Sequence, residues 1–216
     1  STLFPYTTLF RSSYNGDKDP ADTVYNVLRF KSTKQTKNSI KLTWAGAKNA
    51  KRYVIYGSPS GKKKKLKQLA SVKKTNYTVK KVGSKLKKGS YYNFMLLALD
   101  NNDKVLSTSK SIHVAAKGGK VTNAKKVTAK VKKGKKYKAV KKASLKVGKT
   151  LKLKAVVTKQ GKGKIRKFSG VRYESANTAV ATVSSKGKIK AKKAGKCDIY
   201  LIAQNGVSTK VNVVVK

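Results

Sequence analysis

Residues 90–99 read SYYNFMLLAL, and within them apolar side chains occupy every second position from Tyr92 to Ala98. Successive side chains of a β-strand point to opposite faces, so this period of two predicts a strand with one face in a core. The same alternation appears earlier in the chain, at Ile40, Leu42 and Trp44, and later, at Val211, Val213 and Val215. No window shows sustained helical periodicity, and the chain is therefore predicted to be all-β.

Turn signals divide the alternating runs into short strands. They include SPSG at 58–61, Lys186-Gly187 and Asn205-Gly206. Many short strands spaced about 8–12 residues apart are typical of a β-sandwich. The region 116–136 is rich in Lys, Gly and Ala, and we place a domain boundary there. The prediction is two tandem immunoglobulin-like antiparallel β-sandwiches, at 25–118 and 119–216, with the core of the second at about 137–216.

The charge of the chain is strongly one-sided. Its 216 residues include 54 Lys plus Arg and 7 Asp plus Glu, a formal net charge of +47, and only five of the basic residues are Arg. Lys acts as a hydrated point charge, whereas the planar Arg fork recognises phosphates and bases in a bidentate manner. The composition therefore predicts diffuse attraction to polyanions and argues against specific nucleic-acid recognition. Self-repulsion at this charge predicts a monomer.

The basic excess belongs to both predicted domains. Residues 25–118 carry 23 basic and 2 acidic side chains, and residues 119–216 carry 29 and 2. The charge is therefore not confined to a basic tail. No stretch approaches the length of an apolar membrane helix, and no membrane span is predicted.

The first 24 residues are set aside from the fold prediction. Residues 1–12, STLFPYTTLFRS, correspond residue by residue to the translation of a common sequencing adapter, and we interpret them as an artefact. Residues 13–24 contain Gly16, Pro20 and three Asp, which predicts a linker from a missing upstream region. A calcium loop is the alternative for these aspartates, but the bidentate Glu at the required spacing is absent.

The first predicted domain resembles a fibronectin type III domain. Three stretches carry the resemblance: NSIKLTW at 38–44, YVIY at 53–56 and SKLKKGSYYNFMLLAL at 84–99. It implies a buried Trp44 and a tyrosine corner, in which the Tyr92 hydroxyl bonds to upstream backbone. Lys88 stands where the family usually has Pro. The core residues expected here are Trp44, Tyr53, Leu86, Tyr92 and Phe94.

The second predicted domain resembles the bacterial Ig-like group 2 domain, the module of intimin and invasin. Two stretches carry the resemblance: LKVGKTLKLKAVV at 145–157 and YESANTAVATVSSKGKIKAKKAGKCDIYLIAQNG at 173–206. It implies turns at Gly148, Gly187 and Gly195, and it places Tyr173 where the family often has Trp. The core residues expected here are Leu151, Tyr173, Val180 and Ile199.

The two resemblances together imply a place and a role for the chain. Such modules resemble spacers and adhesive stalks of surface proteins, and this Lys-rich pair resembles the C-terminal tail of clostridia-type secreted proteins. The expected location is therefore secreted or on the cell surface of a Gram-positive-type bacterium. Composition alone does not indicate export.

Residues with catalytic chemistry are few. His113, the sole His, alternates with Ile112 and Val114 and is predicted to be a strand residue, since no acid lies near it in sequence. Cys197, the sole Cys, excludes an intrachain disulfide and is interpreted as a small strand residue, the alternative being a nucleophile or redox thiol. No catalytic, cofactor-binding or metal-binding residues are predicted, and this fragment is predicted not to be an enzyme. The carboxylates of the two domains are only Asp100, Asp103, Glu174 and Asp198.

Glu174 raises the question of a Lys–Asn isopeptide crosslink, which some surface Ig-like folds contain. Strand alternation argues against it, because Tyr173 is assigned the inward position. Glu174 is therefore predicted to point outward.

A candidate binding site lies in the run GKKKKLK at 61–67, which is predicted to connect two strands. A solvated hairpin, kept from edge-to-edge association by its charges, is the simpler interpretation. Contact with an anionic surface is the functional one. The candidate polyanion-binding residues are Lys62, Lys63, Lys64, Lys65 and Lys67.

The sequence thus favours a non-catalytic spacer or adhesion module that presents or retains an upstream domain at the bacterial envelope. Its expected partners are anionic envelope polymers such as teichoic acid, or a host surface. One alternative is a pair of accessory domains from a secreted enzyme whose catalytic domain is missing. Another is a non-specific nucleic-acid-binding protein, which would need exposed aromatics or Arg at base edges. Most aromatics here fall on inward strand positions.

Overall fold

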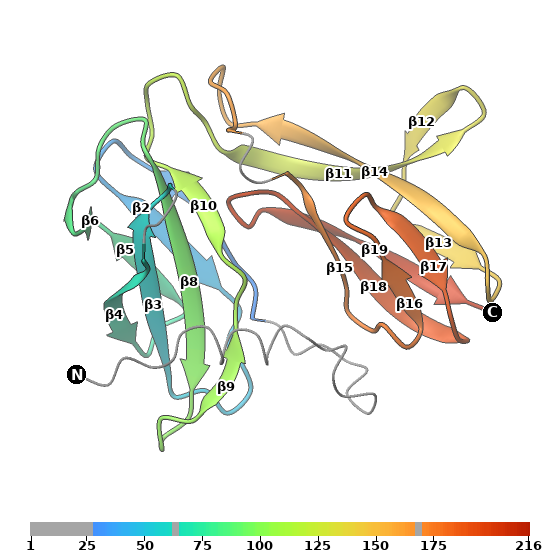
Figure 1. Ribbon diagram of the computed structural model, residues 1–216, viewed down its shortest axis with the longest axis horizontal. Coiled ribbons are helices and arrows are strands. Elements are labelled where there is room, and N and C mark those ends of the chain that lie inside the picture. The colour runs from blue at the N-terminus through green and yellow to red at the C-terminus, as the bar shows by residue number, and fades with distance from the viewer. Residues whose placement is uncertain (1–27, 62–64, 167–169) are drawn as a thin grey trace.

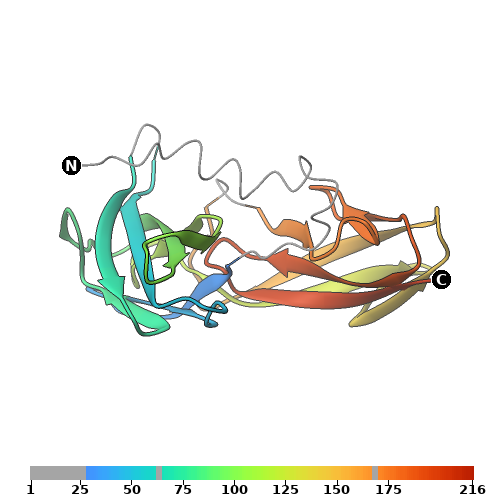
Figure 2. The same ribbon diagram turned by 90° about the horizontal axis from the view of Figure 1, so that it is seen from below.

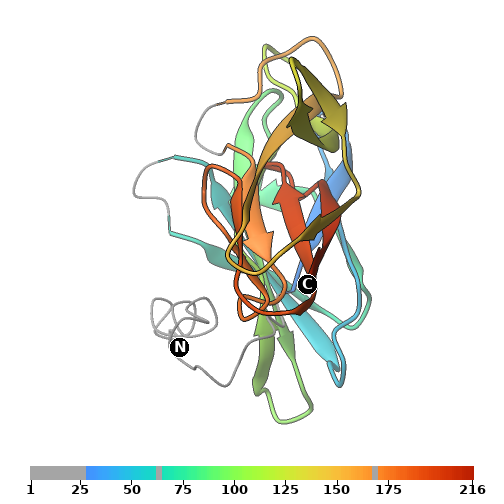
Figure 3. The same cartoon turned by 90° about the vertical axis from the view of Figure 1, so that its right-hand side faces the viewer.

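The computed structural model describes residues 28–61, 65–166 and 170–216, and every regular element in these ranges is a β-strand. Two β-sandwiches lie next to each other along the long axis of the molecule (Figure 1). Figure 3 looks along this axis, with the second sandwich nearer to the viewer. The all-β, immunoglobulin-like fold predicted from strand alternation is confirmed. The predicted adapter and linker segments, 1–12 and 13–24, lie outside the described residues.

The first sandwich consists of a three-stranded sheet facing a larger one. The three-stranded sheet contains, in spatial order, β1 (Phe30–Gln35), β2 (Ile40–Trp44) and β5 (Asn76–Val79). The larger sheet contains β10 (Ile112–Ala115), β8 (Tyr91–Leu99), β3 (Arg52–Pro59) and β4 (Lys67–Val72), and β9 (Val105–Thr108) also pairs with β8. A small hairpin is formed by β6 (Lys81–Val82) and β7 (Ser84–Lys85).

The second sandwich has a five-stranded and a four-stranded sheet. The five-stranded sheet contains β12 (Lys136–Ala139), β11 (Ala124–Lys133), β14 (Thr150–Lys159), β17 (Lys188–Ala191) and β16 (Ala181–Val183). The four-stranded sheet contains β13 (Lys142–Leu145), β19 (Ser208–Val215), β18 (Gly195–Ile202) and β15 (Arg172–Ser175).

One strand pair departs from the predicted antiparallel arrangement. β13 pairs with β19 in parallel, with Lys142 opposite Asn212 and Leu145 opposite Val215. The chain leaves β12 in the five-stranded sheet and enters β13 in the four-stranded sheet within a few residues. This crossing adds β13 to the free edge of β19 in the same direction, which a two-residue hairpin could not do.

Each sandwich has a core of its own. Buried apolar residues of the first lie between Leu28 and Ala116, and those of the second lie between Ala124 and Val215. Of the core residues expected from the sequence, seven are buried: Trp44, Tyr53, Leu86, Tyr92, Phe94, Val180 and Ile199. Leu151 and Tyr173 are half-buried and pack against the second core. Leu151 is only the second residue of β14, where the strand begins.

Tyrosine hydroxyls tie loops of both sandwiches to neighbouring strands. The Tyr92 hydroxyl accepts a hydrogen bond from the backbone amide of Lys87 at 2.7 Å, which is the contact expected of a tyrosine corner. Tyr53 accepts from the amide of Ala47 at 2.9 Å, and its ring meets that of Trp44 edge-to-face at 5.4 Å. Such pairs stabilise a core beyond the area that they bury. The tyrosine corner of the first sandwich therefore forms although Lys88 stands where the family usually has Pro.

Candidate functional site at the domain junction

The second sandwich meets the first through the turn between β18 and β19, residues 203–207. All five of these residues are buried, although turns normally lie on the surface. Figure 2 shows the tip of this hairpin reaching β1 of the first sandwich. The burial therefore comes from docking between domains. We call residues 203–207 the docking turn.

The docking turn hydrogen-bonds to one edge strand of each sheet in the first sandwich, β1 and β10. The backbone amide of Ser32 in β1 donates to the carbonyl of Asn205 at 2.9 Å. The amide of His113 in β10 donates to the carbonyl of Gln204 at 2.6 Å. Unpaired strand edges present free backbone groups that promote association with other chains. The turn satisfies part of both edges and connects the two sheets across their seam.

Asn205 connects three segments with a single side chain. It is fully buried, and its Nδ2 donates to the carbonyl of Ser32 at 2.8 Å and to that of Ala124 at 3.0 Å. Ala124 is the first residue of β11. A buried amide that bonds to both sandwiches fixes their separation at this point, because losing either bond would leave a buried polar group unsatisfied.

Gly206 lets the docking turn approach β1 closely. Its φ of +82° lies in the left-handed region, which favours glycine. A Cβ atom added there would collide with the carbonyl oxygen of Phe30 and would lie 2.8 Å from the Cα atom of Lys31. These neighbours are backbone atoms and have no rotamer by which to move away. Any side chain at position 206 would therefore push the two domains apart.

The connection between the sandwiches, residues 117–123, is also held in place. The Asn123 side chain pairs with Ala115 in both directions: Oδ1 accepts from its amide at 2.8 Å and Nδ2 donates to its carbonyl at 2.9 Å. The Tyr91 hydroxyl donates to the carbonyl of Thr122 at 2.6 Å. The connection follows a defined path along the first sandwich, unlike a flexible Gly-rich linker.

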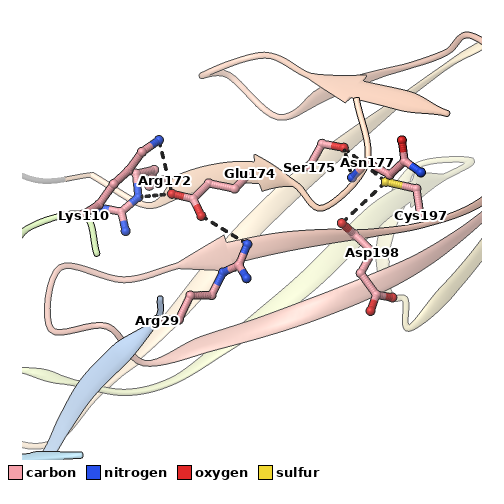
Figure 4. A network of polar contacts seen from close by, with 8 residues as sticks. All are labelled: Arg29, Lys110, Arg172, Glu174, Ser175, Asn177, Cys197 and Asp198. Atoms are coloured by element: carbon pink, nitrogen blue, oxygen red, sulfur yellow. Dashed lines mark hydrogen bonds and ion pairs between the residues drawn. The ribbon is translucent and has the colours of Figure 1, made fainter. Parts of the chain in front are cut away.

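Glu174 is the electrostatic centre of the junction (Figure 4). Its side chain is only 8% exposed, and it lies among three cations. Arg172 Nε, two residues earlier on the same strand, donates to Oε1 at 2.7 Å, and Lys110 Nζ is 3.3 Å from Oε1. Arg29 Nη2 is 3.5 Å from Oε2. Arg29 and Lys110 belong to the first sandwich, so the ion cluster spans both domains.

The first sandwich also contacts the surroundings of this cluster. The Arg29 guanidinium lies 3.8 Å from the centre of the Tyr200 ring, a cation–π contact across the junction. In the other direction, Arg172 Nη1 donates to the carbonyl of Ser111 at 3.3 Å. Burial by itself would raise the pKa of Glu174, but the charges of Arg172, Lys110 and Arg29 together lower it below its ordinary value. Glu174 is therefore ionised at neutral pH.

The outward direction predicted for Glu174 is correct relative to its own sandwich, because Tyr173 faces the core and its hydroxyl reaches β14 of the facing sheet. The Tyr173 hydroxyl accepts from the Ala155 amide at 3.1 Å. The expectation missed that the first sandwich covers this outer face, which leaves Glu174 buried. Outward and exposed are equivalent only in an isolated domain.

The scarce chemical side chains are placed apart from one another. His113 lies on β10, as expected, with its Nδ1 3.0 Å from the Ser60 hydroxyl. Burial and the nearby charge of Arg172 lower the pKa of His113, so it is neutral at pH 7. Cys197 is buried on β18, with its Sγ 3.1 Å from the Ser175 hydroxyl.

The other carboxylates of the described residues have local roles. Asp100 accepts from the amides of Asn102 and Lys104 in the turn after β8. Asp103 pairs with Arg52 at 2.6 Å, and Asp198 pairs with Lys210 at 2.7 Å. In the part of the chain that the structure describes, no three His, Cys, Asp or Glu side chains gather as metal ligands would. Nor do these ranges contain a helix long and apolar enough to cross a membrane.

The Lys run predicted as a polyanion site falls largely outside the described residues. Lys62, Lys63 and Lys64 lie there, whereas Lys65 and Lys67 are exposed at the start of β4. Sequence reasoning also missed the junction. The available signal was the scarcity of Arg: three of the four described Arg residues pair with a carboxylate, and two of those three reach Glu174.

Comparison with known proteins finds a family match for most of the second sandwich. Residues 136–215 match the bacterial Ig-like domain (group 2) family. No curated protein sequence matches the chain.

Several solved structures are similar to parts of this chain. The fibronectin type III domain of human collagen alpha-1(XX) is 17% identical, with a TM-score of 0.33, over 42% of this chain and 83% of that one. A C-terminal fragment of intimin, solved with the intimin-binding domain of its translocated receptor, is 12% identical, with a TM-score of 0.32, over 87% and 62%. The S-layer protein SbsC is 13% identical, with a TM-score of 0.31, over 86% and 40%.

The fold and the junction thus define a tandem of immunoglobulin-like sandwiches. The first has the strand arrangement and tyrosine corner expected of a fibronectin type III-like domain, and residues 136–215 of the second match the bacterial Ig-like domain of group 2. The resemblance of the second predicted domain to the group 2 family is confirmed by this match, and the structure shows the sandwich fold and tyrosine corner that the resemblance of the first implied.

Replacing Gly206 with Ala should undock the domains. We expect the amides of Ser32 and His113, which donate to the docking turn, to exchange with deuterium about 10-fold faster or more, because local opening exposes them. Gly134→Ala is the matched control, since Gly134 also has a positive φ, +58°, but has no atom within 4 Å of an added Cβ. Hydrogen exchange followed by NMR measures both. Equal acceleration in the two variants would contradict the proposed close contact.

Acid should open the junction through Glu174. Because its pKa is lowered in the folded state, its contribution to docking is complete above the ordinary carboxyl pKa of about 4.3 and is lost as pH falls through the lower folded value. The pKa of His113 is also lowered, so its contribution to folding stability is complete above the ordinary His pKa of about 6.5 and is lost as pH falls through the lower folded value.

Small-angle X-ray scattering at constant salt tests this dependence. The radius of gyration of the native chain should stay constant from neutral pH down to about 4.3 and then rise. Glu174→Gln leaves three cations facing one another, so its junction should already be open at pH 7. A closed Gln variant at pH 7 would contradict the assigned role, and Asp103→Asn, which breaks the Arg52 pair away from the junction, serves as the control.

Proposed function

We propose that this chain is a non-catalytic spacer and adhesion module of a bacterial secreted or cell-surface protein. Its role is to hold two sandwiches at a fixed angle and to present or retain a domain that precedes them. The observation that carries this proposal is the docking turn, whose backbone and side-chain bonds reach both sheets of the first sandwich. A spacer needs a defined orientation between its units, and this junction supports one.

The bonding at the junction supports a rigid connection over a hinged one. Domains joined only by a flexible linker are expected to move relative to each other. Here the turn, the connecting segment and the Glu174 cluster each contribute cross-domain contacts at separate points. Three separated attachment points restrict rotation about all axes.

The adhesive part of the proposal rests on charge. Residues 25–216 carry 52 basic and 4 acidic side chains, a net charge of +48. Among the described lysines, only Lys110 and Lys210 form ion pairs with carboxylates. Most of the positive charge therefore has no carboxylate beside it, and polymers such as wall teichoic acid are the partners of matching charge at a bacterial envelope.

The placement of polar side chains supports a non-catalytic role. Ser60 and His113 form a Ser–His pair, yet burial and the nearby charge of Arg172 disfavour the protonated form of the His113 ring. A triad would need a carboxylate to stabilise that protonated form. The described carboxylates are used in turns, surface pairs and the junction.

Binding to cell walls tests the proposed adhesion. The chain should sediment with purified Gram-positive walls at about 0.1 M salt and should detach steeply as salt rises, because charges beyond the Debye length of about 10 Å are screened. Walls stripped of teichoic acid should retain much less protein. Binding that is insensitive to salt, or equal on stripped walls, would contradict the proposal, and a preference for host-cell surfaces would replace the envelope as the target.

A further inference from the structure

One face of the second sandwich contains only basic charge. The strands of the five-stranded sheet hold five Lys in β11, two in β12, three in β14 and two in β17, and none of them contains Asp, Glu or Arg. Apolar side chains alternate with these lysines and face the core: Val131 is opposite Leu153, and both are buried, and the half-buried Leu151 is opposite the buried Ile189. The lysines that alternate with them therefore share the outer face.

The strand registers set these lysines directly against one another. Lys130 in β11 is opposite Lys154 in β14, and Lys152 in β14 is opposite Lys188 in β17. Lys132 in β11 is opposite Tyr137 in β12 on the same face. We call Lys130, Lys152, Lys154 and Lys188 the lysine face. In the described residues, no carboxylate pairs with any of these four ammonium groups.

Like charges directly opposite each other destabilise a sheet. Protection of free edges does not account for this cost, because β11, β14 and β17 are the interior strands of the sheet. Solubility does not require it either, since surfaces of mixed charge are soluble. The facing sheet follows that mixed pattern and holds both carboxylates of the domain, Glu174 and Asp198.

The chemistry of the lysine face indicates the kind of polyanion that it fits. Proteins that bind single-stranded nucleic acid combine basic grooves with aromatic platforms for the bases. Tyr137 is the exposed aromatic here, 44% exposed. Lys154 Nζ lies over its ring, 4.4 Å from the centre, and so covers the face on which a base would stack. Lys ammonium groups on flexible stems recognise phosphate charge without recognising bases. A flat face of this kind suits a flexible chain of phosphates.

We propose that the lysine face is the main docking surface for a linear poly(alditol phosphate) of the bacterial envelope, laid across β11, β14 and β17. This inference rests on the proposed adhesive function and locates it. The exposed lysines of the first sandwich then contribute only long-range attraction.

The test compares two variants of the full chain with equal charge. The face variant carries Lys130→Gln, Lys152→Gln, Lys154→Gln and Lys188→Gln. The control variant carries Lys73→Gln, Lys74→Gln, Lys80→Gln and Lys81→Gln, all at exposed positions of the first sandwich. The probe is lipid-free poly(glycerol phosphate), titrated across a salt series, and thermal unfolding of each variant is recorded in parallel.

The face variant should bind about 10-fold more weakly or worse at 0.1 M salt, and the control at most about 3-fold. The slope of log Kd against log salt should fall by about 3 in the face variant, since each lost contact with a flexible polyanion removes about 0.7. The face variant should unfold at the same or a higher temperature, because like-charge pairs are removed. This result separates lost binding from lost folding.

Three other outcomes would overturn a part of the account. Equal losses in both variants would show that binding is diffuse and would overturn the lysine face. Tighter binding of duplex DNA with the same loss in the face variant would overturn the choice of polymer. If the native chain fails to bind poly(glycerol phosphate) and walls alike, the proposed adhesive function itself is wrong.

Discussion

The arrangement of the whole molecule depends on one buried turn. Residues 203–207 leave the second sandwich and bond to Ser32 and His113, on the free edges of two different sheets of the first. This contact requires Gly206, because a Cβ atom there would collide with the backbone of β1. It also requires Asn205, whose buried amide reaches both domains. Once the turn is docked, the outer face of β15 is covered, and Glu174 must be neutralised by Arg29, Lys110 and Arg172.

Strand alternation was sufficient to predict the fold and most of the core, because each sandwich buries one face of each strand independently of its neighbour. Trp44 and Phe94 lie where the period of two placed them, and Ile199 lies where the family resemblance placed it. The junction was not predictable in the same way. Asn205-Gly206 has the sequence of an ordinary exposed hairpin turn, and Glu174 has an ordinary outward position. Their burial depends on the second domain, and local periodicity contains no information on how two separate cores meet.

The two kinds of cation have different roles in this chain. Arg29 and Arg172 converge on Glu174 and Arg52 pairs with Asp103, which suits a rigid side chain with several directed donors. Most of the cations on the outside are Lys. The four ammonium groups of the lysine face repel one another, and no carboxylate of the described residues pairs with them. The Arg side chains thus help to fix the domain orientation, and the Lys side chains give the exterior its charge. A rigid pair that displays a basic face is a suitable spacer for an anionic envelope.

The central claim is that the docking turn makes one rigid body of two sandwiches. Backbone ¹⁵N relaxation of the 23.6 kDa chain measures this directly, because it gives a rotational correlation time for each domain separately. The account predicts the same correlation time for strands of both sandwiches, equal to that of a single particle of the full mass. Two shorter and unequal correlation times, each matching a particle of about half that mass, would show that the domains tumble independently and would contradict it.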